Sequence, residues 1–273
     1  MYAFFAPSLK SPRIRASLAG LSVVLTTGVI GATASGAYAD AGATNQTTSV
    51  ADLVASGDMD FDTYLASLVE DTSGYWSEQM TSWSSTNGTG PWQPLYYQIV
   101  DGDGDVASQC TDDQGNPEQA ADPDYIPGAD PAFFCPADMT VYLSSQWLYD
   151  HVWTSQDGTA ASDFGVAYVV AHEVGHAVQH DLGITEPDGA ATVAPTELQA
   201  DCLAGVWSNA KYYQNTLEAG DIDEAINAAS AVGDYDYDQQ GHHGTPEERT
   251  SAFATGYNSG QGNTCTLELP GSM

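Results

Sequence analysis

His172, Glu173 and His176 are the residues of this chain whose types and spacing point most directly to chemistry. They form the pattern His-Glu-x-x-His, and on a helix two histidines four positions apart lie on one face. Two imidazoles placed in this way can hold one Zn²⁺, with the glutamate close to the open side of the metal. Such a site turns water into a nucleophile. The alternative is a surface helix that carries two solvated histidines.

The segment around this motif has the pattern of a buried helix. Ser162 or Asp163 can cap its start, and Gly183 is a suitable stop. Two buried histidines without partners would be costly, and a metal removes that cost. The pattern therefore favours the metal site. The apolar residues at helical spacing are Phe164, Ala167, Tyr168, Val170, Ala171, Val174 and Val178.

Glu197 is the candidate for a third zinc ligand, because catalytic zinc takes three protein ligands and keeps one open position. It follows His176 by 21 residues (197 − 176). That distance leaves room for the first helix to end and for a second helix to begin near Pro195, since proline is favourable in a first helical turn. The alternative is a solvated acidic helix face.

Asp201 lies one helical turn after this glutamate, so the two carboxylates share a face. We expect Asp201 to accept a hydrogen bond from the non-ligating nitrogen of His172, which would fix the orientation of that ring. Ala204 and Gly205 continue the face. Their small size would allow the two helices to approach closely, as a shared metal requires.

His243 precedes a predicted helix. Thr245 is its expected N-cap, Pro246 its first residue and Glu248 the matching partner of a capping box. A histidine in that position can reach into a cleft and donate a hydrogen bond to the transition state. A simple turn residue is the alternative.

Several strings of this chain together resemble the putative neutral zinc metallopeptidase family of bacteria. They follow one another in a single order between about Trp76 and Cys265. One departure is Ala177, where many members carry a second histidine, and another is the acidic segment 101–130, which is longer than expected. The matching strings are 134–138 (FCPAD), 141–143 (VYL), 167–179 (AYVVAHEVGHAVQ), 197–207 (ELQADCLAGVW), 220–225 (GDIDEA) and 243–249 (HGTPEER).

The resemblance implies a zinc-dependent peptidase of the gluzincin type that acts on peptides or proteins. Its ligands would be His172, His176 and Glu197, and Glu173 would be its general base. It implies an α+β, helix-rich, zincin-like domain with a small antiparallel sheet above the zinc helix. Such enzymes generally hold extended substrate against an edge strand, and the residues expected there are Val141, Tyr142 and Leu143, by main-chain pairing.

The charge of the chain limits the kinds of partner it can have. It carries 37 acidic and five basic side chains, for a net charge of −32. A surface of that kind repels nucleic acid and anionic membranes, so neither is an expected partner. Solubility outside the cell, or in high salt, is the better explanation than steering of cationic substrates, which salt would screen.

The first 39 residues have the pattern of a secretory signal. Lys10, Arg13 and Arg15 form a basic region, residues 18–32 are apolar, and 37–39 (AYA) provide a cleavage site. We therefore expect a secreted protein without a membrane anchor after cleavage, and an uncleaved anchor facing outside is the alternative. Residues 40–60 would form a linker or short helical prefix, and 61–273 the zinc metallopeptidase domain.

The four cysteines are an even number, which predicts disulfides in a secreted chain. Three pairings are open from the sequence alone. We favour Cys110 with Cys135 and Cys202 with Cys265. Zinc ligation by cysteine is the alternative, but no Cys-x-x-Cys spacing supports it.

The acidic segment 101–130 is predicted to be a long loop, because it is rich in proline and aspartate and shows little periodicity. Asp101, Asp103 and Asp105 alternate with small residues, which suggests a Ca²⁺ site or, as the alternative, a solvated acidic turn. Periodicity elsewhere predicts other elements. These are helices in 50–59, 61–83, 146–153, 195–213, 221–231 and 246–258, and strands in 95–100 and 139–143.

Two other functions compete with a peptidase. The first is a secreted zinc-binding or adhesion protein without catalysis. The second is hydrolysis of a cell-wall amide by the same zinc chemistry. The presence of all three ligands and of the glutamate base favours the enzyme, and substrate preference cannot be read from the motifs.

Overall fold

The computed structural model describes residues 50–87, 92–100, 105–111, 115–124, 126, 128–154, 161–184, 192–237, 239 and 241–265. The predicted signal sequence and residues 40–49 of the predicted linker lie outside these residues, as do Asp101 and Asp103. Among the residues that the structure describes, none of the helices has the length and apolar content needed to cross a bilayer.

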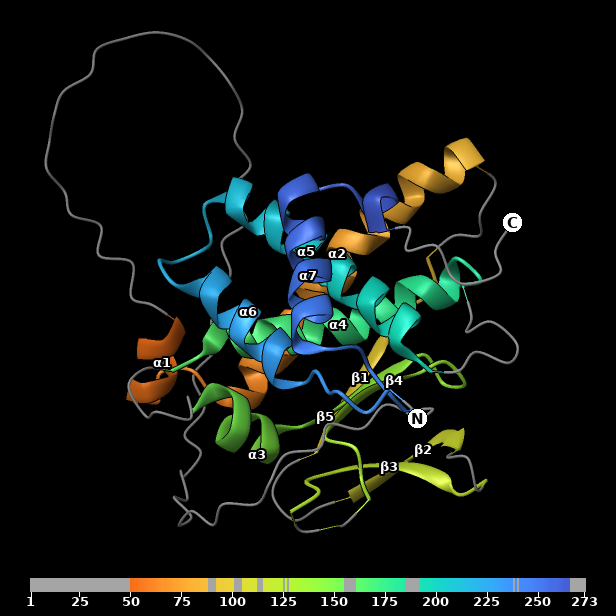
Figure 1. Ribbon diagram of the computed structural model, residues 1–273. Helices are drawn as coiled ribbons and strands as arrows, with labels where there is room; N and C mark the ends of the chain where they lie inside the picture. The colour runs from red at the N-terminus through yellow and green to blue at the C-terminus, as the bar shows by residue number, and fades with distance from the viewer. Residues whose placement is uncertain are drawn as a thin grey trace, which may run out of the picture. The chain divides into compact units, whose positions relative to one another are not determined.

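The helices lie where their periodicity predicted them (Figure 1). The α3 helix continues directly into one π-helical turn, η1 at Tyr149–Trp153, and η2 is a short 3₁₀ turn at Gly262–Cys265. The predicted capping box of α7 is confirmed, with Thr245 and Glu248 exchanging hydrogen bonds. The helices are α1 Val50–Ser56, α2 Phe61–Asn87, α3 Ser145–Leu148, α4 Asp163–Asp181, α5 Ala194–Gln214, α6 Asp221–Ala231 and α7 Pro246–Ser259.

A three-stranded sheet packs against α4 through its strand β4. Its strands are β1 at Tyr96–Val100, β4 at Ala132–Cys135 and β5 at Thr140–Ser144, in the order β1-β5-β4. Strand β5 pairs antiparallel with β4 but parallel with β1. The α+β class is therefore confirmed, and the sheet is mixed rather than antiparallel.

The expectation that Val141, Tyr142 and Leu143 form an edge strand is wrong. They belong to β5, the centre of this sheet, whose main chain is already paired with β1 on one side and β4 on the other. The parallel β1, which pairs with β5 across a long stretch of chain, could not be anticipated from local pattern. The edge strand that packs on α4 is β4.

The predicted long loop in the acidic segment is also wrong. It contains β2 at Asp105–Thr111 and β3 at Pro117–Ala121, which form a two-stranded antiparallel sheet with a register shift (Figure 1). These strands are polar, and most residues of β2 are exposed or half-buried, so apolar alternation is weak. The Cys110–Cys135 disulfide joins β2 to β4.

Helix α4 is surrounded, since it packs against α2, α5, α6 and β4. A Cβ atom added at Gly175 would lie 3.1 Å from the carbonyl oxygen of Ala200, so this glycine of the motif brings α4 close to α5. Gly205 serves a different contact from the one expected. A Cβ there would lie 2.1 Å from the carbonyl oxygen of Phe253, so the small face at Gly205 admits α7.

Candidate metal centre

His172, His176 and Glu197 converge as the motif predicted, on two packed helices. The Nε2 atoms of the two histidines are 3.1 Å apart. The Glu197 oxygens lie 3.2 Å from His172 Nε2 and 3.3 Å from His176 Nε2. All three residues are buried. Glu197 lies in the first turn of α5, where the helix dipole favours an anion.

The hydrogen bonds behind the two rings direct their lone pairs to one point. His172 Nδ1 lies 2.8 Å from Asp201 Oδ1, which is the contact that the sequence predicted. His176 Nδ1 lies 2.8 Å from Gln179 Oε1. Since both acceptors are oxygens, each Nδ1 is the donor, and each Nε2 carries a lone pair whenever its ring is neutral. Two such nitrogens and a carboxylate in a buried cluster call for a cation, and this donor set suits zinc.

Asp201 is the centre of a buried network that includes Arg249 and Tyr168. Arg249 donates to both oxygens, from Nε at 2.8 Å and from a terminal nitrogen at 2.9 Å. The Tyr168 hydroxyl donates to the oxygen that also accepts from His172. Burial alone would raise the pKa of Asp201, but Arg249 and then His172 lower it. Asp201 is thus held as a carboxylate that orients His172.

The electrostatics of the two helices that carry the candidate ligands favour positive charge at the centre. Burial would lower the pKa of His172, yet Asp201 and Glu197 outweigh it and raise that pKa to about 10. Burial would also raise the pKa of Glu197, whereas the two histidines hold it well below its usual range. The same negative charges that favour a proton on His172 would stabilise a metal cation between the three side chains.

Glu173 lies in the same buried stretch of α4 and is 1% exposed. Its Oε2 has no hydrogen-bond partner among the described residues. Burial raises the pKa of Glu173, while the neighbouring charges of His172 and His176 oppose that rise. A carboxylate of increased basicity next to the ligands has the properties of a general base.

His243 precedes α7, and its main chain is hydrogen-bonded to Asp234. Its main-chain N–H donates to Asp234 Oδ2 at 3.0 Å, while its Nδ1 lies 3.8 Å from that oxygen, beyond hydrogen-bonding distance. Its Nε2 is buried and has no hydrogen-bond partner within the described part of the chain. Burial lowers the pKa of His243, and the charges of Glu197 and Arg249 act on it from nearby. The lowered pKa favours the neutral form of the ring.

A second group of side chains, Asp163, Asp221 and Glu224, could also hold a metal by distance alone. Main-chain N–H groups donate to all three carboxylates, that of Phe164 to Asp163 Oδ1 and Glu224 Oε2, and that of Glu218 to Asp221 Oδ2. It therefore acts as the junction between the starts of α4 and α6.

The suggestion of a calcium site has no support. Asp105 is the first residue of β2, and its Oδ2 accepts a hydrogen bond from Gln119 at 3.0 Å. Neither of the two metal-ligand groups found among the described residues includes it. Asp101 and Asp103 lie outside those residues. The disulfides Cys110–Cys135 and Cys202–Cys265 are confirmed, so the cysteines are not zinc ligands.

Sequence reasoning missed Arg249, Tyr168 and Gln179 as parts of the site. A signal for Arg249 was present, because only Lys211 and Arg249 are basic beyond residue 15. A lone arginine in so acidic a chain is a natural partner for a buried carboxylate. Tyr168 and Gln179 lie four residues before His172 and three after His176, at spacings that reach the same helix face.

Comparison with curated proteins finds relatives that match part of this chain. "Uncharacterized protein YpfJ" of Escherichia coli K12 is 41% identical over 154 residues, covering 49% of this chain and 52% of the relative. "Uncharacterized protein Rv2575" of Mycobacterium tuberculosis H37Rv is 36% identical over 161 residues, covering 49% and 53%. The chain thus spans about half the length of these curated relatives. No solved structure matches it.

The family described as putative neutral zinc metallopeptidase matches residues 9–267, nearly the whole chain. That span includes the three converging side chains, the glutamate beside them and His243. The chain therefore belongs to the putative neutral zinc metallopeptidase family.

Proposed function

We propose that this protein is a zinc-dependent peptidase in which His172, His176 and Glu197 hold the metal and Glu173 is the general base. The convergence of two imidazole Nε2 atoms and one carboxylate at distances of 3.1–3.3 Å in a buried site carries this proposal. Family membership supports it at the level of zinc peptidases. Peptides or proteins are accordingly the substrate class.

The residues of the site divide the work of peptide hydrolysis. When bound, zinc supplies Lewis acidity that polarises a carbonyl and lowers the pKa of water. Glu173 accepts a proton from the attacking water and then delivers it to the leaving amine. Arg249 and Asp201 keep the His172 ring in the orientation that presents Nε2, and Gln179 does the same for His176.

His243 is the proposed donor to the oxyanion. Because its Nδ1 lies beyond hydrogen-bonding distance of Asp234, no hydrogen bond fixes the ring proton at Nδ1, and the neutral ring can carry that proton at Nε2. That nitrogen is buried and lacks a partner among the residues described, as expected of a donor that waits for a substrate.

Replacement of His243 by alanine should lower kcat/KM roughly 10²-fold, the usual loss for one oxyanion donor. Zinc content should not change, because His243 is not a ligand. His151→Ala is the matched control. That histidine stacks on Trp147 and contacts Asp124, and neither of these residues belongs to the metal centre. Peptidase assays of the three proteins decide the point, and equal kcat/KM for wild type and His243→Ala would remove His243 from the mechanism.

We further propose that the protein works outside the cytoplasm. The signal-like pattern of residues 1–39 motivates this, and two disulfides are typical of oxidising compartments. Fractionation of the native host with detection of the protein tests it. A reduced, full-length protein confined to the cytosol would contradict this localisation.

The proposed activity is tested by mixing the purified protein with casein, with a degenerate peptide library and with peptidoglycan stem peptides. Cleavage of casein or library peptides that stops after chelation and returns with zinc supports the proposal. Cleavage confined to stem peptides would identify a cell-wall amide hydrolase. Zinc binding with no cleavage of any of them would favour a binding protein without catalysis.

A further inference from the structure

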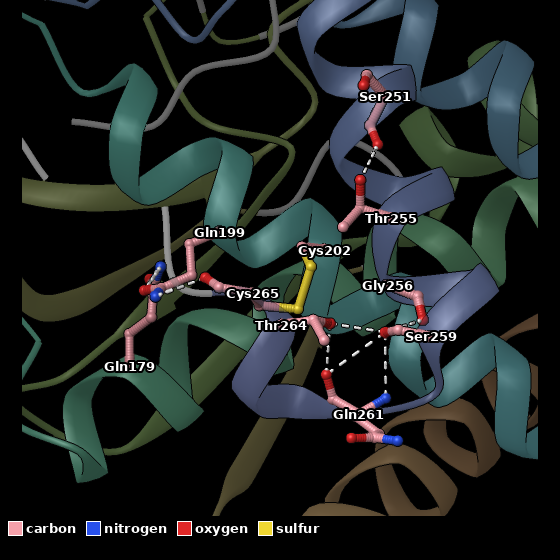
Figure 2. The surroundings of a disulfide bond; sticks show 10 residues. All are labelled: Gln179, Gln199, Cys202, Ser251, Thr255, Gly256, Ser259, Gln261, Thr264 and Cys265. Atoms are coloured by element: carbon pink, nitrogen blue, oxygen red, sulfur yellow. Dashed lines mark hydrogen bonds between the residues drawn. A yellow bond between two sulfur atoms is a disulfide. The ribbon is translucent and has the colours of Figure 1, made fainter. Parts of the chain in front are cut away.

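A continuous chain of hydrogen bonds connects the ligand His176 with a disulfide. His176 Nδ1 donates to Gln179 Oε1 at 2.8 Å. Gln179 Nε2 donates to Gln199 Oε1 at 3.0 Å, and Gln199 Nε2 donates to the carbonyl oxygen of Cys265 at 3.0 Å. Cys265 is bonded to Cys202. Figure 2 shows both glutamines beside this disulfide.

The direction of this chain is set by two main-chain carbonyl oxygens, those of Cys265 and Thr196. A main-chain carbonyl oxygen only accepts, so Gln199 must turn its amide nitrogen towards Cys265 and its oxygen towards Gln179. Gln179 must then present its nitrogen to Gln199, and this nitrogen also donates to the carbonyl oxygen of Thr196 at 2.7 Å. Its oxygen consequently faces His176, where only a protonated Nδ1 can donate. The arrangement therefore reserves the Nε2 lone pair of His176 for a metal.

Burial makes these contacts hard to replace. Gln179 is 4% and Gln199 8% exposed, and Cys202 and Cys265 are 2% and 1% exposed. Water has little access to take over a lost amide bond in such a place, so each unsatisfied group would cost free energy.

The disulfide is the covalent link that holds Cys265 against α5. The η2 turn is tied to the end of α7 by hydrogen bonds among Ser259, Gln261 and Thr264 (Figure 2). Cys202 lies on α5 three positions after Gln199, so both occupy one helix face. Helix α5 thus carries a proposed ligand, one glutamine of the chain and half of the disulfide.

We propose that Gln179 and Gln199 are positioning residues for His176, and that the Cys202–Cys265 disulfide completes the metal site by fixing the Cys265 carbonyl at the end of their hydrogen-bond chain. This inference rests on the proposed zinc site. It predicts that formation of this disulfide, unlike that of Cys110–Cys135, increases the affinity for zinc.

Zinc affinity measured by competition with a chromogenic chelator tests the proposal on the full folded protein. Gln199→Ala keeps the disulfide and should weaken zinc binding roughly tenfold, the lower end of the range for partners of metal-bound histidines. Cys202→Ala/Cys265→Ala should weaken it by a similar factor. The triple variant Gln199→Ala/Cys202→Ala/Cys265→Ala should bind zinc as tightly as either parent variant. Both sets of changes interrupt the same chain of hydrogen bonds, so their effects on zinc affinity should not add. Cys110→Ala/Cys135→Ala is the matched control and should bind zinc like wild type.

A spectroscopic measurement separates positioning from general loosening of the fold. Nitrogen-15 NMR of the His176 imidazole in metal-free protein should show one tautomer, protonated at Nδ1, in wild type. Gln199→Ala should show a measurable share of the other tautomer, because only the Thr196 carbonyl then holds the Gln179 amide. Folding of each variant is followed by thermal unfolding, and Gln199→Met keeps most of the volume of the side chain if alanine unfolds the protein.

The outcomes distinguish the relay from the metal site itself. Folded Gln199 variants that bind zinc as tightly as wild type would overturn the relay. Additive losses in the triple variant would overturn the link between the disulfide and the glutamines. Wild-type protein that binds no zinc would instead overturn the proposed site on which the inference rests.

Discussion

Replacement of Glu173 by glutamine should lower kcat by roughly 10⁴-fold, the upper end of the contribution of general acid–base catalysis. The expected effect is large because one carboxylate serves twice, first as base and then as acid. Glutamine has nearly the same shape but cannot accept the proton. The measurement is kcat on a cleaved library peptide, together with zinc content.

Zinc content of Glu173→Gln should equal that of wild type, since the residue is not among the ligands. Glu70→Gln makes the same chemical change on the exposed face of α2 and should leave kcat unchanged. A Glu173→Gln variant that turns over at the wild-type rate would exclude Glu173 as the base. Loss of the metal together with activity would instead make Glu173 a residue that supports binding.

Replacement of Arg249 by methionine should destabilise the protein by about 3–5 kcal/mol, as happens when one partner of a buried ion pair is removed. Arg249 is 2% exposed and Asp201 0% exposed. The arginine donates to both oxygens of that carboxylate. Without it, Asp201 would remain as a buried charge with only His172 and Tyr168 as donors. Urea unfolding of metal-free protein measures the loss.

Lys211→Met is the matched control, because Lys211 is the other basic residue of the described chain. It lies 2.6 Å from Asp71, whose side chain is 46% exposed, so water can replace the lost partner. The expected loss is about 1 kcal/mol or less. Equal losses for the two variants would show that Arg249 contributes no more than a cation whose partner carboxylate is half exposed.

The loss in Arg249→Met should also depend on pH in a defined direction. Arg249 and His172 lower the pKa of Asp201 against the effect of burial. A carboxyl group with a lowered pKa stabilises the folded state above its unfolded pKa of about 3.9, and this contribution disappears as the pH falls through the folded pKa. The difference between wild type and Arg249→Met should therefore shrink in acid.

The sequence predicted those parts of the fold that depend on residues close to one another along the chain. Helices α4, α5 and α7 follow from apolar spacing, from Pro195 in a first turn and from the Thr245 capping box. The ligands follow from i, i+4 geometry on one helix, with a carboxylate on the next. The contact of Asp201 could be predicted because a zinc-bound histidine needs a hydrogen-bond acceptor at its non-ligating nitrogen.

The parts that sequence did not predict depend on contacts between distant residues. The parallel pairing that makes β5 central joins segments more than 40 residues apart, and no local signal encodes it. Strands β2 and β3 are too polar to show alternation. Nothing in the local sequence distinguishes Gln179 and Gln199 from other polar helix residues. Only the packing of α4, α5 and η2 connects them by hydrogen bonds to each other and to Cys265 (Figure 2).

The central claim is that His172, His176 and Glu197 hold one zinc ion, and metal content by elemental mass spectrometry tests it most directly. Wild-type protein purified without chelator is compared with Glu197→Ala. The account predicts one zinc per chain in wild type and a large loss in the variant. Zinc retained equally by both would contradict Glu197 as a ligand, and wild type without zinc would contradict the metal centre.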